Sequence, residues 1–176
     1  MQEFKRITRA TYRAAGNVVA AASTAPFLEI NGAAGKVIRI KKIILGGMSL
    51  TAVAYLRLQA QKFSSAHTVG TRVAATVVPL DANSPAGGAT VGHYTAAPTP
   101  GVLIGAIGEK RALAQATTAV AAAIPDYAIP FEFGDQDNNE DATLRAAAQN
   151  ISVAFGAAPA TAVTLSYEIE WTEDGN

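Results

Sequence analysis

Strict alternation of apolar and polar residues is the feature that most constrains this chain. In residues 164–173, TLSYEIEWTE, every second side chain is apolar and its neighbours are polar or acidic. The same period of two occurs in residues 54–63, AYLRLQAQKF, and in residues 150–155, NISVAF. Successive side chains of a strand point to opposite faces, so this pattern predicts half-buried β-strands.

The alternation changes phase once, within residues 36–45, KVIRIKKIIL. Ile38 and Ile40 share one face, whereas Ile43 continues the apolar series on the other parity. One extra residue in a strand moves every following side chain to the opposite face. The phase change therefore predicts a β-bulge at Lys41–Lys42.

Other segments also have the composition of strands. They are residues 27–30, 71–80, 89–96, 101–116 and 129–134. Short stretches rich in Gly, Pro, Asn and Asp separate these segments and are typical of turns. Eight or nine strands in one chain predict an all-β fold, an antiparallel β-sandwich or barrel. We expect a basic N-terminal arm over residues 1–24 and a single domain over residues 25–176.

Two Ala-rich segments, residues 109–124 and 141–150, have a composition that also suits helices. Thr117 and Thr118 weaken a helix in the first segment, and the second continues into the alternating pattern of residues 150–155. We favour a strand followed by a loop in both places, with a short helix as the alternative.

Charge is unevenly distributed along a chain whose formal net charge is zero. Residues 1–72 hold eleven Lys and Arg against two Glu, a net charge of +9. Residues 73–176 hold three Lys and Arg against twelve Asp and Glu, a net charge of −9. Two explanations are open. Strands from both parts of the chain interleave and neutralise one another, or a basic end meets an acidic surface of a partner or of another copy.

The composition narrows the classes of function. Charged residues make up 16% of the chain, below the usual figure of about 25%, which indicates that partners cover part of the surface. The chain has no Cys, so it has no disulfide, thiol nucleophile or thiolate metal site. No apolar run reaches the roughly 20 residues of a membrane span, and we expect no membrane partner. Gly16 and Asn17 interrupt the Ala-rich start, so we expect no signal peptide.

Candidates for catalysis are few. His93 lies in a predicted strand and His67 in a predicted loop, and neither has a nucleophile or an acid beside it in the sequence. Glu168 and Glu170 lie about 7 Å apart on one face of a strand, where alternating acids typically face solvent. We therefore predict no catalytic residue and no cofactor.

Residues 135–141, DQDNNED, begin like a calcium-binding loop. The Gly and the final Glu of such a loop are missing, so we favour a solvated acidic loop, with a weak structural cation as the alternative. The basic residues of segment 1–42 lack a set of stacking aromatic side chains, so we expect no sequence-specific binding of nucleic acid. In residues 77–101, VVPLDANSPAGGATVGHYTAAPTPG, the turn residues and the extended APTPG stretch indicate a scaffolding connection rather than a reactive loop.

Several of these stretches, taken in order, resemble the small virion structural proteins of tailed bacteriophages. The stretches are VIRIKKIILGG (37–47), the loop 77–101, FEFG (131–134), TLRAAAQNISVAF (143–155) and YEIEWTE (167–173). The resemblance extends over about residues 10–173, and the Ala-rich segment 116–124 departs from it. It implies a jelly-roll β-sandwich of about eight strands without catalytic residues. It also implies a place on the capsid or at the head–tail and tail assemblies, often as a trimer.

We therefore expect a non-enzymatic virion protein that is assembled in the cytoplasm of the bacterial host. The leading hypothesis is a homotrimeric capsid-decoration or cement protein, whose partners are its own copies and the major capsid protein or other virion proteins. The alternatives are a collar, tail or baseplate component and a host-surface module that binds a receptor or glycan, for which Tyr94 and Tyr127 are the candidate aromatic residues. An enzyme is a third class. The predicted partner-binding residues are all basic: Lys5, Arg6, Arg9, Arg13, Lys36, Arg39, Lys41 and Lys42.

Overall fold

The computed structural model describes residues 9–116, 127–134 and 142–175. Within these ranges the chain forms twelve β-strands and no helix, which confirms the predicted all-β class. The strands are β1 (Ala10–Ala20), β2 (Leu28–Asn31), β3 (Lys36–Leu50), β4 (Ala54–Phe63), β5 (Thr71–Ala74), β6 (Val77–Pro79), β7 (Thr90–Ala96), β8 (Leu103–Ala116), β9 (Ile129–Glu132), β10 (Thr143–Leu144), β11 (Asn150–Phe155) and β12 (Val163–Gly175). None of the described segments is a helix of the length and apolarity needed to cross a membrane.

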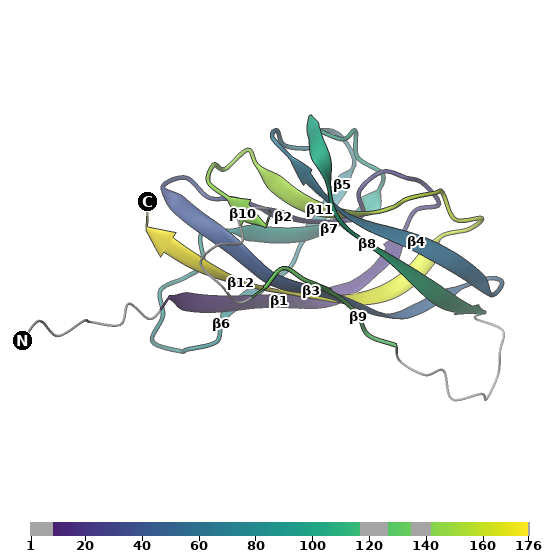
Figure 1. Ribbon diagram of the computed structural model, residues 1–176, viewed down its shortest axis with the longest axis horizontal. Helices are drawn as coiled ribbons and strands as arrows, with labels where there is room; N and C mark the ends of the chain where they lie inside the picture. Colours follow the sequence, from purple (N-terminus) through teal and green to yellow (C-terminus); the bar gives the residue numbers. More distant parts are fainter. Residues whose placement is uncertain (1–8, 117–126, 135–141, 176) are drawn as a thin grey trace, which may run out of the picture.

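The strands belong to one curled sheet (Figure 1). Neighbours along the sheet follow the order β5-β7-β2-β11-β4-β8-β3-β12-β1-β6, and β9 and β10 each pair with β3 outside this path. We call β6, β1, β12, β3 and β9 the β12 half of the sheet. We call β5, β7, β2, β11, β4 and β8 the β11 half. The inner faces of the two halves enclose the core.

The prediction of a purely antiparallel sheet is wrong where the two halves join. Ser49 and Leu50 at the end of β3 pair in parallel with Gln115 and Ala116 at the end of β8. The other strand pairs among the described residues are antiparallel. The parallel pair exists because β3 continues past the predicted end of its strand, at residue 45, and so reaches β8.

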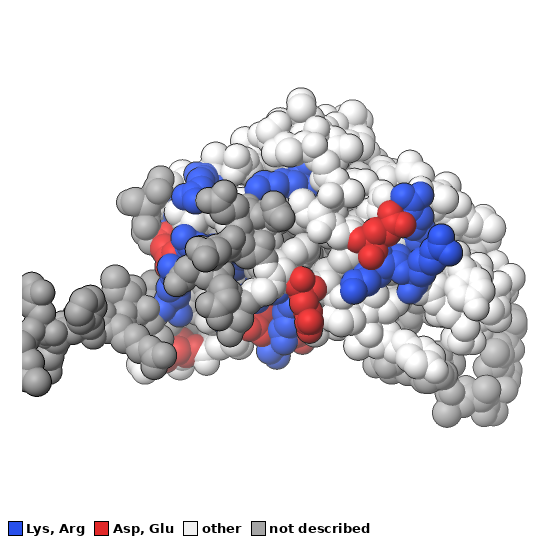
Figure 2. Space-filling view, viewed as in Figure 1, with Lys and Arg blue, Asp and Glu red and all other residues white. Residues whose placement is uncertain are grey.

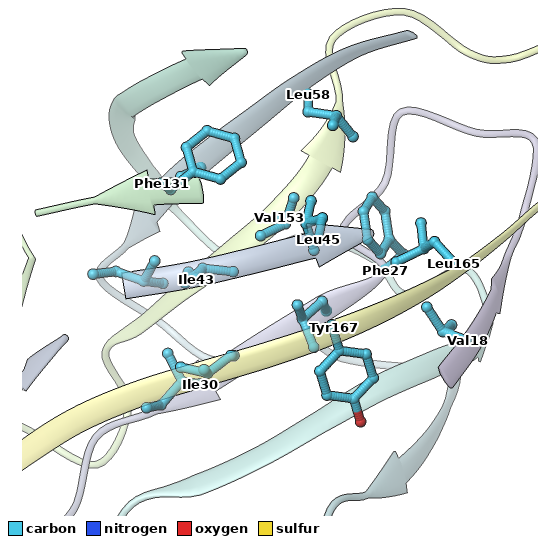
Figure 3. Packing of buried hydrophobic residues seen from close by; sticks show 14 of the residues in the cluster. Val18, Phe27, Ile30, Ile43, Leu45, Leu58, Phe131, Val153, Leu165 and Tyr167 are labelled. Carbon is cyan, nitrogen blue, oxygen red and sulfur yellow. The ribbon is translucent and has the colours of Figure 1, made fainter. Parts of the chain in front are cut away.

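Alternating side chains from both halves meet in one apolar cluster (Figure 3). The labelled members from the β12 half are Val18, Ile43, Leu45, Phe131, Leu165 and Tyr167, and those from the strands of the β11 half are Ile30, Leu58 and Val153. A hydrogen bond also crosses between the halves, because Nδ1 of His93 on β7 lies 3.0 Å from Oη of Tyr167 on β12. Burial of this apolar surface is the main term that stabilises the sheet.

The predicted bulge in β3 is confirmed. Lys42 lies opposite Glu170 and Ile40 lies opposite Trp171, so Lys41 is the extra residue against β12. The bulge lets the isoleucines on both sides of it face the core in spite of their different parity. It also places two consecutive lysines beside the acidic face of β12.

Part of the segment predicted as an N-terminal arm, residues 1–24, is a strand of the sheet. Ala10–Ala20 form β1, which pairs with β12 along its whole length and with β6 at one end. The inward face of β1 includes Ala14 and Gly16, small residues with little preference for strands, so alternation was weak there. Gly16 leaves room for a neighbour, because a Cβ at this position would lie 2.8 Å from Oη of Tyr167. Residues 1–8 of the predicted arm lie outside the described residues.

Three further expectations need correction or completion. The predicted strand over residues 71–80 is two strands, because β5 pairs with β7 in the β11 half and β6 pairs with β1 in the β12 half. The chain crosses between the halves after Ala74, which ends the first strand. Residues 109–116 continue β8, in agreement with the favoured strand, whereas residues 117–126 lie outside the described residues. In segment 141–150, a short strand at Thr143–Leu144 and a turn precede β11.

Candidate functional site

The outer face of the β12 half carries interleaved charges from three neighbouring strands. Glu170 of β12 lies between Arg13 of β1 and Lys42 of β3. Arg13 Nη2 donates a hydrogen bond to Glu170 Oε2 at 3.1 Å, and Lys42 Nζ lies 3.4 Å from the same oxygen. Lys41 Nζ lies 3.9 Å from the other carboxylate oxygen, and Arg13 Nε lies 3.4 Å from Glu168 Oε1. We call these five residues the charged strip.

The charged strip is neutralised within the chain. Partial burial acts to raise the pKa of Glu170, but the hydrogen bond from Arg13 and the positive charges of Lys42 and Lys41 outweigh it and lower that pKa. Glu168 is likewise paired with cations, so both glutamates of this strand face form ion pairs. This confirms the first explanation of the charge asymmetry, because acids from the second part of the chain neutralise cations from the first.

The same pairing extends to most of the predicted partner-binding residues. Beyond Arg13, Lys41 and Lys42, Arg9 Nε lies 2.9 Å from Asp174 Oδ1, and Arg39 forms an ion pair with the same carboxylate. Lys36 begins β3, and its Cγ lies near Gly88. Lys5 and Arg6 lie outside the described residues. On the face drawn in Figure 2, several acidic side chains lie directly beside basic ones.

Two shallow recesses adjoin the charged strip. One has a volume of about 410 Å³ and is lined by Lys41, Lys42, Glu132, Gly134 and Glu170. The other has a volume of about 490 Å³ and is lined by Ala15, Gly16, Asn17, Ile44, Gly46, Ala128, Ser166, Tyr167 and Glu168. Among the described residues no group of His, Asp and Glu could hold a metal ion. The acidic segment 135–141, the candidate for a weak cation site, lies outside the described residues.

A second surface lies on the outer face of the β11 half. Residues 64–70 connect β4 to β5, and residues 97–102 connect β7 to β8. These connections run side by side: Ser64 N–H donates to the Val102 carbonyl at 2.9 Å, and Thr68 and Thr99 exchange two backbone hydrogen bonds of 3.0 and 2.8 Å. We call these two segments the paired connections.

A buried histidine holds the paired connections to the sheet. The side chain of His67 is fully buried, and its Nδ1 accepts a hydrogen bond from Gly101 N–H at 2.9 Å. Because Nδ1 is an acceptor, the neutral ring carries its proton on Nε2, which donates to Ser152 Oγ at 2.9 Å. The Ser152 hydroxyl in turn donates to Asn150 Oδ1 at 2.9 Å. His67 is therefore a donor to Ser152 and cannot act as its base, so this pair is structural and not nucleophilic.

A buried carboxylate completes the network beneath the paired connections. Glu29 of β2 accepts hydrogen bonds from the Tyr94 hydroxyl at 3.0 Å and from Asn31 Nδ2 at 2.8 Å, and it forms an ion pair with Arg72. Burial and the negative charge of Glu29 raise the pKa of Tyr94. Sequence analysis missed this network because most of its members come from segments that are far apart in the chain. The single acid within an apolar strand, Glu29, was the only available signal.

The paired connections also present apolar side chains to solvent. Val69 is 81% exposed and Val102 is 65% exposed, and Leu103 and Ile104 at the start of β8 are also exposed. Figure 2 shows no charged side chain on the uppermost part of the molecule, where β8 begins in Figure 1. Val69 has a φ of 59°, in the left-handed region that a β-branched residue strongly disfavours. An exposed apolar side chain is thus held on a strained backbone.

The loop within residues 77–101 is anchored to the sheet. The buried carboxylate of Glu173 accepts hydrogen bonds from Gly88 N–H at 2.8 Å and from Ala89 N–H at 2.9 Å. The Tyr12 hydroxyl donates to the carbonyl of Pro85 at 3.0 Å. These contacts support the scaffolding interpretation of the loop.

His93, the second histidine, faces the core. It lies against Tyr167, and burial, assisted by the positive charge of Arg72, lowers its pKa.

Comparison of the chain with known protein families, with curated proteins and with solved structures finds no match. Function is therefore inferred from the fold and from the two surfaces themselves.

Proposed function

We propose that this chain is a non-enzymatic structural protein of a tailed-phage virion, a jelly-roll protein that decorates and stabilises the head. The observation that carries the proposal is the order in which the strands pair. The sequence resemblance to small phage virion proteins supports it, as does the exposed apolar character of the paired connections.

The pairing order is that of an antiparallel ribbon folded back on itself. The four strands β1, β2, β3 and β4 pair with β12, β11, β9 and β8 respectively, so the early strands meet the late strands in reverse order. Further pairing of β12 with β3 and of β11 with β4 produces the groups β1-β12-β3-β9 and β2-β11-β4-β8. This order supports a jelly roll, a fold in which two four-stranded groups are connected as Greek keys. Within this proposal, β5, β6, β7 and β10 are additions to the eight-stranded scheme.

The surfaces favour docking through the paired connections. The cations of the charged strip already have partners within the chain, so they offer a partner protein little net attraction. Val69 and Val102, by contrast, expose apolar area, and Val69 does so on a strained backbone. Backbone strain of this kind is concentrated at functional sites, and exposed apolar patches typically mark interaction sites.

The proposed partner is the major capsid protein, with an uncharged, apolar contact area that matches Val69, Val102, Leu103 and Ile104. A stable contact needs about 800 Å² from each partner, so neighbouring residues of the paired connections would take part. A decoration protein bound across the joints between capsid subunits adds interface that must break before the head opens. The homotrimer predicted from the resemblance would multiply the number of such contacts for each bound particle.

The test is sedimentation of the purified protein with emptied heads of the phage or prophage that carries its gene. The proposal predicts binding that saturates at a fixed ratio of copies to heads. Val102→Asp should weaken this binding at least about tenfold, since a charge would be buried without a partner. Val19→Asp is the matched control, because Val19 is 56% exposed but lies on β1, away from the paired connections.

Protein that remains in the supernatant, or variants that bind equally well, would contradict the proposal. Saturable binding to tails in place of heads would move the chain to the collar, tail or baseplate alternative. Of the aromatic residues considered for receptor or glycan binding, Tyr94 is buried against Glu29 and only Tyr127 is exposed.

A further inference from the structure

We propose that His67 is an acid-sensitive latch: protonation of its ring releases the paired connections from the outer face of the β11 half. The inference is independent of the proposed function, because it concerns a conformational change of the isolated chain.

The hydrogen-bond geometry around His67 accommodates only the neutral ring. Nδ1 accepts the Gly101 N–H at 2.9 Å, so a proton added to Nδ1 would place two N–H groups against each other. The side chain is fully buried, so water cannot accept the new N–H in the closed state. The ring of Phe63 packs edge-on against the imidazole with 4.6 Å between ring centroids, and the centroid of the Tyr94 ring lies at 6.1 Å, so aromatic rings cover two sides of His67.

The charged groups around His67 come from two strands and partly cancel. Glu29 of β2 lies 3.9 Å from Nε2 and favours the protonated ring. Arg72 of β5 is bound to the same carboxylate and offsets its charge. Phe63 of β4, Tyr94 of β7 and Ser152 of β11 also face the ring, and these three side chains are uncharged. Burial is the larger effect and lowers the pKa of His67, with the charge of Glu29 opposing it.

The direction of the pH dependence follows from this shift. The exposed ring of the open state titrates near the ordinary value of about 6.5, and the buried ring titrates below it. Below pH 6.5 the open state therefore binds more protons than the closed state, so acidification favours opening. The segments set free carry Val69 and Val102, so acid would alter the apolar surface that these residues form.

The test is amide hydrogen exchange of the wild-type protein between pH 7.5 and pH 5, expressed as protection factors that correct for intrinsic exchange. The range stays above the ordinary titration of carboxyl groups, about pH 4. We expect protection of Thr68, Thr99 and Gly101 to fall by up to about tenfold for each pH unit as the pH drops from about 6.5 toward the lower pKa of the buried ring, and to level off below that pKa. The amides of β12 should keep their protection over the same range.

Two variants separate His67 from other sources of pH dependence. His67→Gln keeps a side-chain donor for Ser152 but does not titrate, so its paired connections should show the same protection at pH 7.5 and pH 5. His93→Gln removes the other histidine, which faces the core at Tyr167, and should keep the wild-type response.

Wild-type protection that does not change with pH, or an unchanged pH response in His67→Gln, would overturn the proposal. If His67→Gln does not fold, the ring nitrogens of wild-type His67 can be followed by NMR. Protonation of that ring with full retention of Gly101 protection would then refute the latch, and loss of that protection in step with protonation would support it.

Discussion

Replacing Val69 with Asn tests whether the left-handed backbone at this position lowers the free energy of unfolding. Val69 has a φ of 59° and is 81% exposed. The left-handed conformation costs an L-residue roughly 1–2 kcal/mol, and Asn adopts it far more readily than a β-branched residue. We therefore expect Val69→Asn to make the isolated protein more stable.

The size of the gain follows from strain and burial. Full burial of a Val side chain contributes about 1.5–3 kcal/mol, but about a fifth of this side chain is covered, so its removal costs about 0.5 kcal/mol. Subtracting this from the relieved strain leaves a gain of about 0.5–1.5 kcal/mol in the free energy of unfolding. For a chain of this length that corresponds to an increase in Tm of about 1–6 °C.

The assay is thermal unfolding followed by circular dichroism, with Val19→Asn as the matched control. Val19 is 56% exposed and lies in β1, where Asn is a poorer strand former by up to about 1 kcal/mol, so this control should lose stability. The reasoning predicts opposite signs for the two variants. Equal losses of Tm would refute the claim that the backbone at position 69 is strained.

Two further substitutions test packing and anchoring. Gly16→Ala should lower the free energy of unfolding in urea by about 1–3 kcal/mol, because its Cβ would lie 2.8 Å from Oη of Tyr167. Gly105→Ala is the control and should change stability little, since no atom lies within 4 Å of the added group. A loss at Gly105 as large as at Gly16 would contradict this. Glu173→Gln should cost about 1.5–3 kcal/mol and speed proteolysis within residues 81–89, because the charged acceptor for two backbone N–H groups is lost. Glu132→Gln, an exposed control, should leave both readouts unchanged, and equal effects in the two variants would count against the anchoring role.

Local alternation was sufficient for most of the strands and for one detail of register. The strands at residues 54–63 and 150–155 match β4 and β11, and the bulge at Lys41 follows from parity alone. These features depend on neighbouring residues, whose side chains must face either the core or solvent. By contrast, β1 was assigned to an arm because Ala14 and Gly16 supply its inward face, and small side chains give little apolar signal.

The closure of the sheet and the two surfaces depend on contacts between distant residues. No local pattern indicates that the end of β3 meets the end of β8 in parallel, or that His67 lies beneath Gly101 and against Ser152. Neutralisation between the two parts of the chain was one of two explanations of the charge asymmetry, but the individual ion pairs could not be assigned, because Arg13 and Glu170 are 157 residues apart. Val69 differs from the other exposed valines in its positive φ, which no sequence pattern indicates.

Hydrogen exchange of the protein bound to emptied heads, compared with the free protein at pH 7.5, tests the central claim most directly. The account predicts new protection of the backbone amides in residues 64–70 and 97–104. The amides of β1, β12 and the first part of β3 should exchange as in the free protein. New protection confined to these three strands would show that the charged strip, and not the paired connections, is the docking surface. No new protection in either place would contradict the proposed role on the head.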